Sequence, residues 1–411
     1  MADSLSLGPA GPTVATASPT ADQLTMLARL GIASALLYAL MWWWQLDWNH
    51  IIPRDGTGLV IGRDFISFWV AGHLAWDSDP ARFYDLATYQ AHIATVAGPN
   101  YPGQVWSYPP SIMLLAWPLN FLPYLPALML WTLIGPLVFL AVVSRWTRSP
   151  MLLLAAMLCP AAVFGLVSGQ IAYPVAALVL TILGLRQSRP LLAGVLLGLL
   201  TIKPHLGLFF PLLLLAERNW RMIFAAAASG LAIALLTALI WGSGVWVAYF
   251  TEGVANQTLA LSDPQALLAP FMPTVLMNLR GAGVGLPMAQ IVQLAASVLA
   301  AALILWHFRS RPSADNWRDN AGFLAAAVLG TPYMLSYDTL ALVTAMLLAV
   351  ATQPVPRLLA LGCWLLASLQ LALAPLGVPG SALVPLLAAV ILLRRPGGES
   401  VERITPPPRP C

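Results

Sequence analysis

Long apolar runs with almost no charged residues dominate the chain, and short polar segments separate them. The runs are continuous and do not alternate apolar with polar positions, as the strands of a barrel would. They lie at residues 25–46, 109–122, 125–146, 150–168, 170–187, 190–203, 206–217, 221–241, 287–308, 320–335, 338–352, 357–374 and 380–394. We therefore predict an all-α polytopic membrane protein, a bundle of about twelve transmembrane helices.

Arginines gather between these runs and predict the orientation of the chain. Positively charged loops usually face the cytoplasm. If the N-terminus is cytoplasmic and residues 109–146 cross the membrane an odd number of times, every arginine cluster lies on the cytoplasmic side. The clusters are Arg145 and Arg148, Arg186 and Arg189, Arg218 and Arg221, Arg309, Arg311 and Arg318, Arg357, and Arg394 and Arg395.

The stretch 109–122 decides this count. It is short, and prolines, which break helices, interrupt it in "YPPSIMLLAWPLNFLPYLP". We predict a re-entrant segment that enters the membrane without crossing it, followed by one full span. The alternative, a full crossing at 109–122, would place several arginine pairs outside.

Composition agrees with a membrane protein. Hydrophobic residues make up 59% of the 411 and charged residues 9%, whereas a soluble domain carries roughly 25% charged residues. The net charge of +4 does not suggest a nucleic-acid partner. Cys159, Cys363 and Cys411 lie far apart, so the sequence predicts neither a disulfide framework nor a metal site.

The chain divides into one long domain and two tails. Residues 1–24 are predicted to be a disordered cytoplasmic tail, and they lack the basic start and short apolar core of a signal peptide. The transmembrane domain is predicted at 25–395, with a large first extracytoplasmic loop at 47–108. Residues 396–411 are predicted to be a second disordered cytoplasmic tail.

The polar segments outside the arginine clusters all fall on the extracytoplasmic face in this arrangement. They are the loop 47–108, "SGQ" at 168–170, "KPH" at 203–205, the loop 242–286 and "TPYMLSYD" at 331–338. A single active site at the outer leaflet requires such convergence.

Lys203 is the only lysine in the chain, and it stands between two short apolar runs. An ionisable group at membrane depth indicates function by default. Pro204 breaks the helix beside it, so Lys203 and His205 are predicted at a helix break that suits an anion such as phosphate. The alternative is a lysine that extends to the membrane interface.

The other polar motifs each allow a simpler interpretation. "SGQ" can be a tight turn with Gly169 at the bend and Gln170 as a solvated cap. Asp338, next to Tyr333 and Tyr337, opens an apolar run and can be a helix cap. Their position on the same face as Lys203 favours a functional role.

The first loop combines carboxylates with aromatic rings. Asp64, Phe68 and Gly72 share one face of a predicted helix, and Phe65 and Trp69 lie beside it. A helix lying at the membrane surface with its aromatic residues among the headgroups fits this pattern. Asp64 is then held close to the membrane.

These motifs in this order resemble glycosyltransferase family 87, an integral-membrane family of the GT-C superfamily. The resemblance covers roughly residues 25–395, and the family includes the mycobacterial mannosyltransferase that extends phosphatidylinositol mannosides. The motifs that carry it are "RDFISFWVAG" after the first span, "YPP" at 108–110, "SGQ", "KP" and "TPYMLSYD".

The resemblance implies a GT-C-like fold and a reaction at the extracytoplasmic face. A sugar moves from a polyprenyl-phosphate carrier to a hydroxyl of a lipid or glycan acceptor, with inversion of the anomeric centre. Asp64 matches the position of the superfamily's catalytic base. Mannose, another hexose or a pentose is the expected sugar. The mannolipid enzymes tend to carry histidine near the last motif, where this sequence has Tyr333 to Asp338.

For the donor that the resemblance implies, chemistry predicts roles for further residues. A polyprenyl phosphate is a good leaving group, so the enzyme needs a base and positive charge on the phosphate. Lys203, His205 and Arg63 are the predicted phosphate ligands. No cofactor and no metal are expected. The predicted substrate-binding residues are Phe68, Trp69, Tyr108, Gln170, Tyr333, Tyr337 and Asp338.

Two other classes of function remain open. Many spans with broken helices and intramembrane charge also suit a lipid or glycan transporter or flippase. The absence of repeated motifs between the two halves and the concentration of polar residues on one face weigh against it. The third possibility is a scaffold subunit of a cell-envelope assembly. For each of these functions, we expect the protein to lie in a bacterial cell membrane, to contact the surrounding lipids and to bind no nucleic acid.

Overall fold

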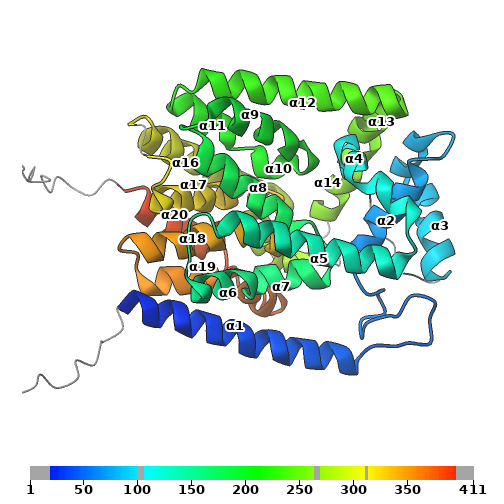
Figure 1. The fold of residues 1–411 in the computed structure, drawn as a ribbon, viewed down its shortest axis with the longest axis horizontal. Coiled ribbons are helices and arrows are strands. Elements are labelled where there is room, and N and C mark those ends of the chain that lie inside the picture. Colours follow the sequence, from blue (N-terminus) through cyan, green and yellow to red (C-terminus); the bar gives the residue numbers. More distant parts are fainter. Residues whose placement is uncertain (1–18, 100, 102–105, 263–268, 311–312, 395–411) are drawn as a thin grey trace, which may run out of the picture.

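The computed structural model describes residues 19–394, except residues 100, 102–105, 263–268 and 311–312. Within these described residues the regular structure is helical, and β-structure is limited to isolated bridges from Asp47 to Arg54 and from Arg54 to Val60. The predicted all-α class is therefore confirmed (Figure 1).

Five helices in the described part of the chain are long and apolar enough to cross a membrane. They are α1 (Pro19–Trp44), α5 (Tyr124–Val143), α12 (Trp220–Trp241), α16 (Leu286–Phe308), and α19 (Arg357–Leu373) with the turn η8 (Ala374–Leu376) that continues it. The pair α6 (Pro150–Met157) and α7 (Pro160–Val167) makes a sixth if the two count as one span bent by 52°. These helices agree with a polytopic membrane protein, and the predicted number of about twelve spans stays a prediction.

Shorter apolar helices form the centre of the bundle. Nearly every residue of α17 (Trp317–Gly330) and α18 (Leu340–Thr352) is buried, as expected for helices that are apolar all round, which α18 is throughout and α17 is after its polar first turn. Figure 1 shows α1 and α12 along opposite margins of the bundle. The other short helices here are α8 (Ala172–Leu185), α9 (Pro190–Leu199), η4 (Leu200–Ile202), α10 (Pro204–Gly207), α11 (Phe210–Ala216) and α20 (Leu383–Leu392).

The first loop and the proline-rich stretch after it pack together. The loop carries α2 (Phe65–Leu74), η1 (Pro80–Tyr84) and α3 (Leu86–Ala97). The proline-rich stretch folds into η2 (Pro110–Ile112), α4 (Met113–Ala116) and η3 (Trp117–Phe121), each too short to cross a membrane alone. Gly72 allows α2 to approach this stretch, because a Cβ there would lie 2.4 Å from the Ala116 carbonyl oxygen. Its re-entrant path in a membrane stays a prediction.

The remaining elements lie between α12 and α20. The segment after α12 is a continuous series of short helices. One of them, η5, is a π-helix, a form that often occurs at functional sites. The elements are α13 (Gly244–Ala248), η5 (Tyr249–Gly253), α14 (Val254–Ser262), η6 (Ala269–Phe271), α15 (Val275–Gly281), η7 (Ser336–Thr339) and η8 (Ala374–Leu376).

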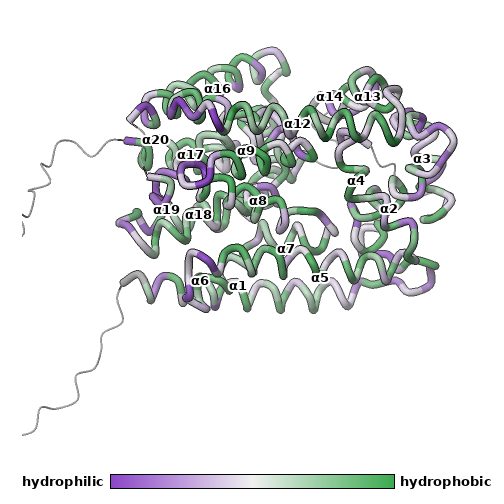
Figure 2. Tube along the Cα trace, turned by 45° about the horizontal axis from the view of Figure 1, so that its top comes forward, coloured by the Kyte–Doolittle hydropathy of each residue, from purple (hydrophilic) through white to green (hydrophobic). Residues whose placement is uncertain are grey.

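The bundle has two distinct ends. The start of α1 and the end of α20 lie at one end, and α2, α3 and α13 lie at the other (Figure 1). Figure 2 shows hydrophilic residues gathered around α17 at the first end and around α3 at the second, with hydrophobic residues between them. The side of a membrane on which each end lies stays a prediction.

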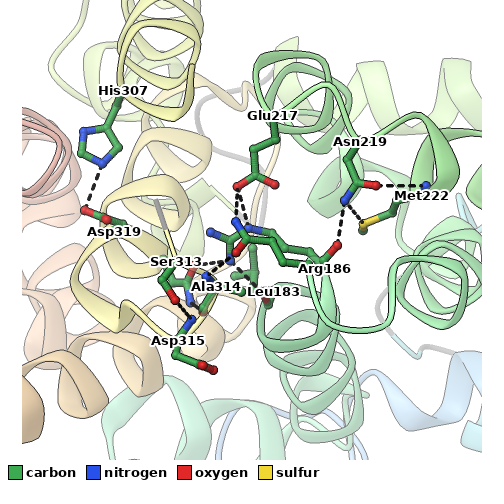
Figure 3. A network of polar contacts seen from close by, with 12 residues as sticks. Leu183, Arg186, Glu217, Asn219, Met222, His307, Ser313, Ala314, Asp315 and Asp319 are labelled. Atoms are coloured by element: carbon green, nitrogen blue, oxygen red, sulfur yellow. Dashed lines mark hydrogen bonds and ion pairs between the residues drawn. The ribbon is translucent and has the colours of Figure 1, made fainter. Parts of the chain in front are cut away.

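A buried ionic network ties the helices together at the end near α17 (Figure 3). The sequence predicted Arg186 in a cytoplasmic basic cluster, but its side chain is fully buried. Arg186 Nε lies 2.9 Å from Glu217 Oε1, and Nη1 donates to Asn320 Oδ1 at 2.8 Å. Arg186 is therefore an internal link between the ends of α8 and α11 and the start of α17.

The predicted N-terminal tail is too long by several residues. Helix α1 begins at Pro19, and Leu24 is already buried against the bundle. Proline is favoured at the start of a helix and Asp22 suits the first turn, which explains the earlier start. The rest of that tail, residues 1–18, and the predicted tail at 396–411 lie outside the described residues.

Candidate active site

The "SGQ" turn brings two distant segments together. The carbonyl oxygen of Ser168 accepts hydrogen bonds from the backbone N–H groups of Asp64, at 2.8 Å, and Phe65, at 3.2 Å. Gly169 has φ +66°, and a Cβ at this position would lie 2.5 Å from the Cβ of Phe65. The predicted bend at Gly169 is confirmed, and it places Gln170 directly beside Asp64.

Substituting Gly169 tests the importance of this contact. Gly169→Ala is expected to lower the free energy of unfolding by about 2–5 kcal/mol, because left-handed strain adds to the clash with Phe65. Gly58→Ala is the matched control: Gly58 has φ +80° but nothing within 4 Å of a Cβ, so strain alone would cost about 1–2 kcal/mol. Thermal unfolding of both variants measures the difference. Equal losses would mean that the close contact at Gly169 does not matter.

The carboxylate of Asp64 is held by neutral donors. Gln170 Nε2 donates to Asp64 Oδ2 at 2.8 Å, and the Tyr337 hydroxyl reaches the same oxygen at 3.3 Å. The hydroxyl of Tyr108 donates to Gln170 Oε1 at 3.1 Å. Gln170 is buried, so its interpretation as a solvated cap is wrong. The first loop and the "SGQ" segment, two of the polar segments predicted on one face, therefore meet at Asp64.

Burial of the Asp64 carboxyl raises its pKa above the usual value, since low polarity disfavours the charged form. The hydrogen bond from Gln170 and the positive charge of Lys203 act in the opposite direction but do not outweigh burial. Asp64 as a whole residue is half-buried. A carboxylate with a raised pKa beside a pocket is a typical general base.

Lys203 and Asp338 form a buried ion pair at the predicted helix break. The break is confirmed: η4 ends at Ile202, Lys203 has φ −137°, and α10 starts at Pro204. Lys203 Nζ lies 2.6 Å from Asp338 Oδ1, and the two side chains are 2% and 1% exposed. His205 Nε2 lies 3.4 Å from Asp338 Oδ2. Asp338 is thus a partner of two of the three predicted phosphate ligands, Lys203 and His205.

Aromatic rings join the two clusters. The Tyr337 ring lies beneath Lys203 Nζ, 4.8 Å from ring centre to nitrogen, while its hydroxyl contacts Asp64. The ring of Tyr333 meets that of His205 edge-on, with 5.4 Å between centroids. Asp64 and Lys203 consequently belong to one connected site.

A pocket of about 370 Å³ opens beside this site. Among the described residues, Asp64 does not line the pocket, but Tyr337, which hydrogen-bonds to Asp64, does. The residues that α14 and η5 contribute come from the loop 242–286, which was predicted on the same face but in which no single residue was predicted for the site. The lining residues are Ser107, Tyr108, Pro109, Ile202, Lys203, Pro204, His205, Leu208, Tyr249, Val254, Gln257, Thr258, Thr331, Pro332, Tyr333, Leu335, Tyr337 and Asp338.

Three predicted site residues lie elsewhere in the described structure. Arg63 Nε binds Asp55 at 2.6 Å and does not line the pocket. Phe68 is fully buried among aromatic rings, which include Tyr108. Trp69 Nε1 donates to the carbonyl oxygen of Leu122 at 2.9 Å. These side chains support the loop that carries Asp64, and their sequence pattern does not distinguish support from binding.

Comparison with known proteins identifies the family. The model of glycosyltransferase family 87 matches residues 106–336, which is more than half of the chain. The chain belongs to glycosyltransferase family 87. The matched region of this family 87 protein contains Tyr108, Gln170, Lys203 and Tyr333, whereas Asp64 lies before it. Neither a curated protein nor a solved structure matches the chain.

Membership in family 87 narrows the possible functions. The protein is a membrane glycosyltransferase, which uses a sugar donor and an acceptor. In the described residues, no group of three or more His, Cys, Asp or Glu side chains could hold a metal ion.

Proposed function

We propose that this family 87 enzyme transfers a sugar, mannose or another hexose or pentose, from a polyprenyl phosphate to a hydroxyl of a lipid or glycan. The site is proposed to face the extracytoplasmic side of a bacterial cell membrane. The observation that carries the proposal is the link through Tyr337 between the Asp64 carboxylate and the Lys203 ammonium, at the edge of a pocket.

Asp64 is the proposed general base. The acceptor oxygen attacks the anomeric carbon from the face opposite the phosphate, and its proton passes to Asp64. The bond between the anomeric carbon and the phosphate oxygen breaks, and its electron pair leaves with the polyprenyl phosphate. This displacement inverts the anomeric centre. A positioned base contributes about 10²–10⁴-fold to such a step.

Lys203 and His205 are the proposed phosphate ligands. An ammonium carries three N–H donors, and Asp338 is the hydrogen-bond acceptor that Lys203 Nζ has among the described residues. Donors therefore remain for a phosphate, and Lys203 lines the pocket despite its burial. His205 is 16% exposed and lines the same pocket. Positive charge here stabilises the negative charge that develops on the leaving phosphate.

The pocket suits one sugar with its phosphate. Its volume of about 370 Å³ lies within the usual range for small-molecule sites, roughly 300–1,000 Å³. Tyr249 from η5, together with Gln257 and Thr258 from α14, supplies polar and aromatic side chains to one wall of the pocket. We propose that Tyr108, Tyr333 and the α14 wall contact the sugar.

A transfer assay tests the proposal. Purified protein in lipid vesicles would receive a panel of radiolabelled polyprenyl-phosphate sugars and extracted envelope lipids. We expect label to move from one of these carriers to a lipid or glycan. Binding of nucleotide sugars with transfer from them, and none from any polyprenyl-phosphate sugar, would overturn the proposed donor.

The acid side of the pH profile provides a second test. The base acts only when ionised, so kcat/KM falls as the pH drops through the pKa of Asp64. Burial raises this pKa above the ordinary aspartate value of 3.8. We therefore expect activity to be lost on acidification at a higher pH than an ordinary aspartate would give. An acid limb at or below 3.8, with circular dichroism showing intact helices, would contradict Asp64 as the base.

A further inference from the structure

The two oxygens of the Asp64 carboxylate differ in their surroundings. Both donors, Gln170 Nε2 and the Tyr337 hydroxyl, reach Oδ2. Within the described residues, Oδ1 accepts no hydrogen bond from a side chain or from the backbone. Two donors on one oxygen fix the rotation of the carboxylate and leave the other oxygen open.

We propose that Gln170 and Tyr337 are positioning residues that fix the Asp64 carboxylate through Oδ2, so that Oδ1 takes the acceptor's proton. This proposal rests on the proposed role of Asp64 as the base. It adds the atom that accepts the proton and the two side chains that present it. Neither Gln170 nor Tyr337 needs to touch the substrate for this purpose.

The orientation of the Gln170 amide is itself fixed. The Asp64 carboxylate can only accept and the backbone N–H of Ile171, 3.4 Å from Gln170 Oε1, can only donate, so Nε2 must face Asp64, and Oε1 accepts from the Tyr108 hydroxyl at 3.1 Å. Tyr108 is held in turn, because its carbonyl oxygen accepts from the Tyr84 hydroxyl at 2.7 Å. A rotated amide would turn an acceptor oxygen toward the carboxylate, which is unfavourable. The chain of hydrogen bonds therefore allows one arrangement at Asp64.

Tyr337 fixes the distance between the Asp64 carboxylate and the Lys203 ammonium. Its hydroxyl contacts Asp64 Oδ2, and its ring face lies under Lys203 Nζ. The tyrosine ring is rigid, so the base cannot move relative to the ammonium without moving Tyr337. Transfer needs the acceptor hydroxyl and the donor phosphate at one separation, and small errors in placement reduce rates strongly.

Tyr337→Phe and Gln170→Leu test the proposal, each removing one donor with little change of volume. We expect kcat to fall by roughly 10- to 100-fold, the effect of losing one hydrogen bond to a charged group. We expect the acid limb of kcat/KM to move to higher pH, because removal of a donor disfavours the ionised carboxylate. The KM for the donor would change little.

The matched control is Tyr173→Phe. It removes another buried tyrosine hydroxyl, which donates to the Met157 carbonyl oxygen at 2.8 Å and does not contact Asp64. We expect it to leave the acid limb in place. If Gln170→Leu does not fold, the isosteric Tyr337→Phe alone decides.

The outcomes separate this proposal from the proposed function. An inactive Asp64→Asn together with Tyr337→Phe and Gln170→Leu of unchanged kcat and pH profile would overturn the positioning role and leave Asp64 as the base. Full turnover by Asp64→Asn would overturn both. A lowered kcat without movement of the acid limb would also contradict positioning through Oδ2.

Discussion

Asp64→Asn is expected to lower turnover by about 10²–10⁴-fold, because asparagine cannot accept the proton of the acceptor hydroxyl. Asparagine has nearly the same shape as aspartate and keeps an oxygen for the donors Gln170 and Tyr337. We therefore expect the variant to fold and to bind the donor as the natural protein does. Single-turnover transfer and donor-binding assays on the same preparation measure the two properties.

Asp77→Asn is the matched control for this prediction. Asp77 lies in the same loop, is exposed, and accepts hydrogen bonds only from its neighbour Ser78 among the described residues. Its replacement should leave turnover unchanged. Normal turnover by Asp64→Asn would place the base elsewhere, and Asp338 would be the next candidate.

Lys203→Met is expected to destabilise the protein by about 3–5 kcal/mol, because it removes the ammonium that pairs with the buried Asp338 carboxylate and leaves the more distant His205, at 3.4 Å, to balance that charge. The sequence alone predicts Lys203 as a phosphate ligand, which implies an effect of this substitution on donor binding. The ion pair with Asp338 changes that expectation, since Lys203 also balances charge inside the bundle. Thermal unfolding measures the loss, and donor binding is compared at a temperature where both proteins are folded.

The double variant Lys203→Met with Asp338→Leu separates stability from phosphate binding. Replacing both partners of a buried ion pair by apolar residues is often neutral or stabilising. We expect the double variant to regain most of the lost stability and still to bind the donor poorly. Donor binding equal to that of the natural protein would contradict the role of Lys203 at the phosphate.

The family and two local features followed from short motifs. Pro204 lacks the backbone N–H that a continuous helix needs, and Gly169 tolerates the left-handed conformation of its turn. Both features are properties of one or two residues, so the sequence predicted the helix break and the bend correctly. The order of the motifs predicted the family that the matched region bears out.

The partners of the polar side chains could not be predicted. Gln170 allowed a solvated cap and Arg63 allowed a phosphate ligand, yet Gln170 is buried on Asp64 and Arg63 pairs with Asp55. Phe68 shows the same limit, because a binding ring and a core ring have the same sequence pattern. Arg186, expected in a cytoplasmic cluster, became part of the interior.

The sequence by itself determined the helical class, the membrane location, the broken helix at Lys203 and the turn at Gly169. These depend on apolar runs and on the backbone preferences of proline and glycine, which act over a few residues. Only the tertiary structure decided the contacts of the site. Asp64 and Gln170 are 106 positions apart, and Lys203 and Asp338 are 135 apart. Such pairs form only when helix packing brings donor and acceptor within about 3 Å, and sequence spacing does not encode that packing.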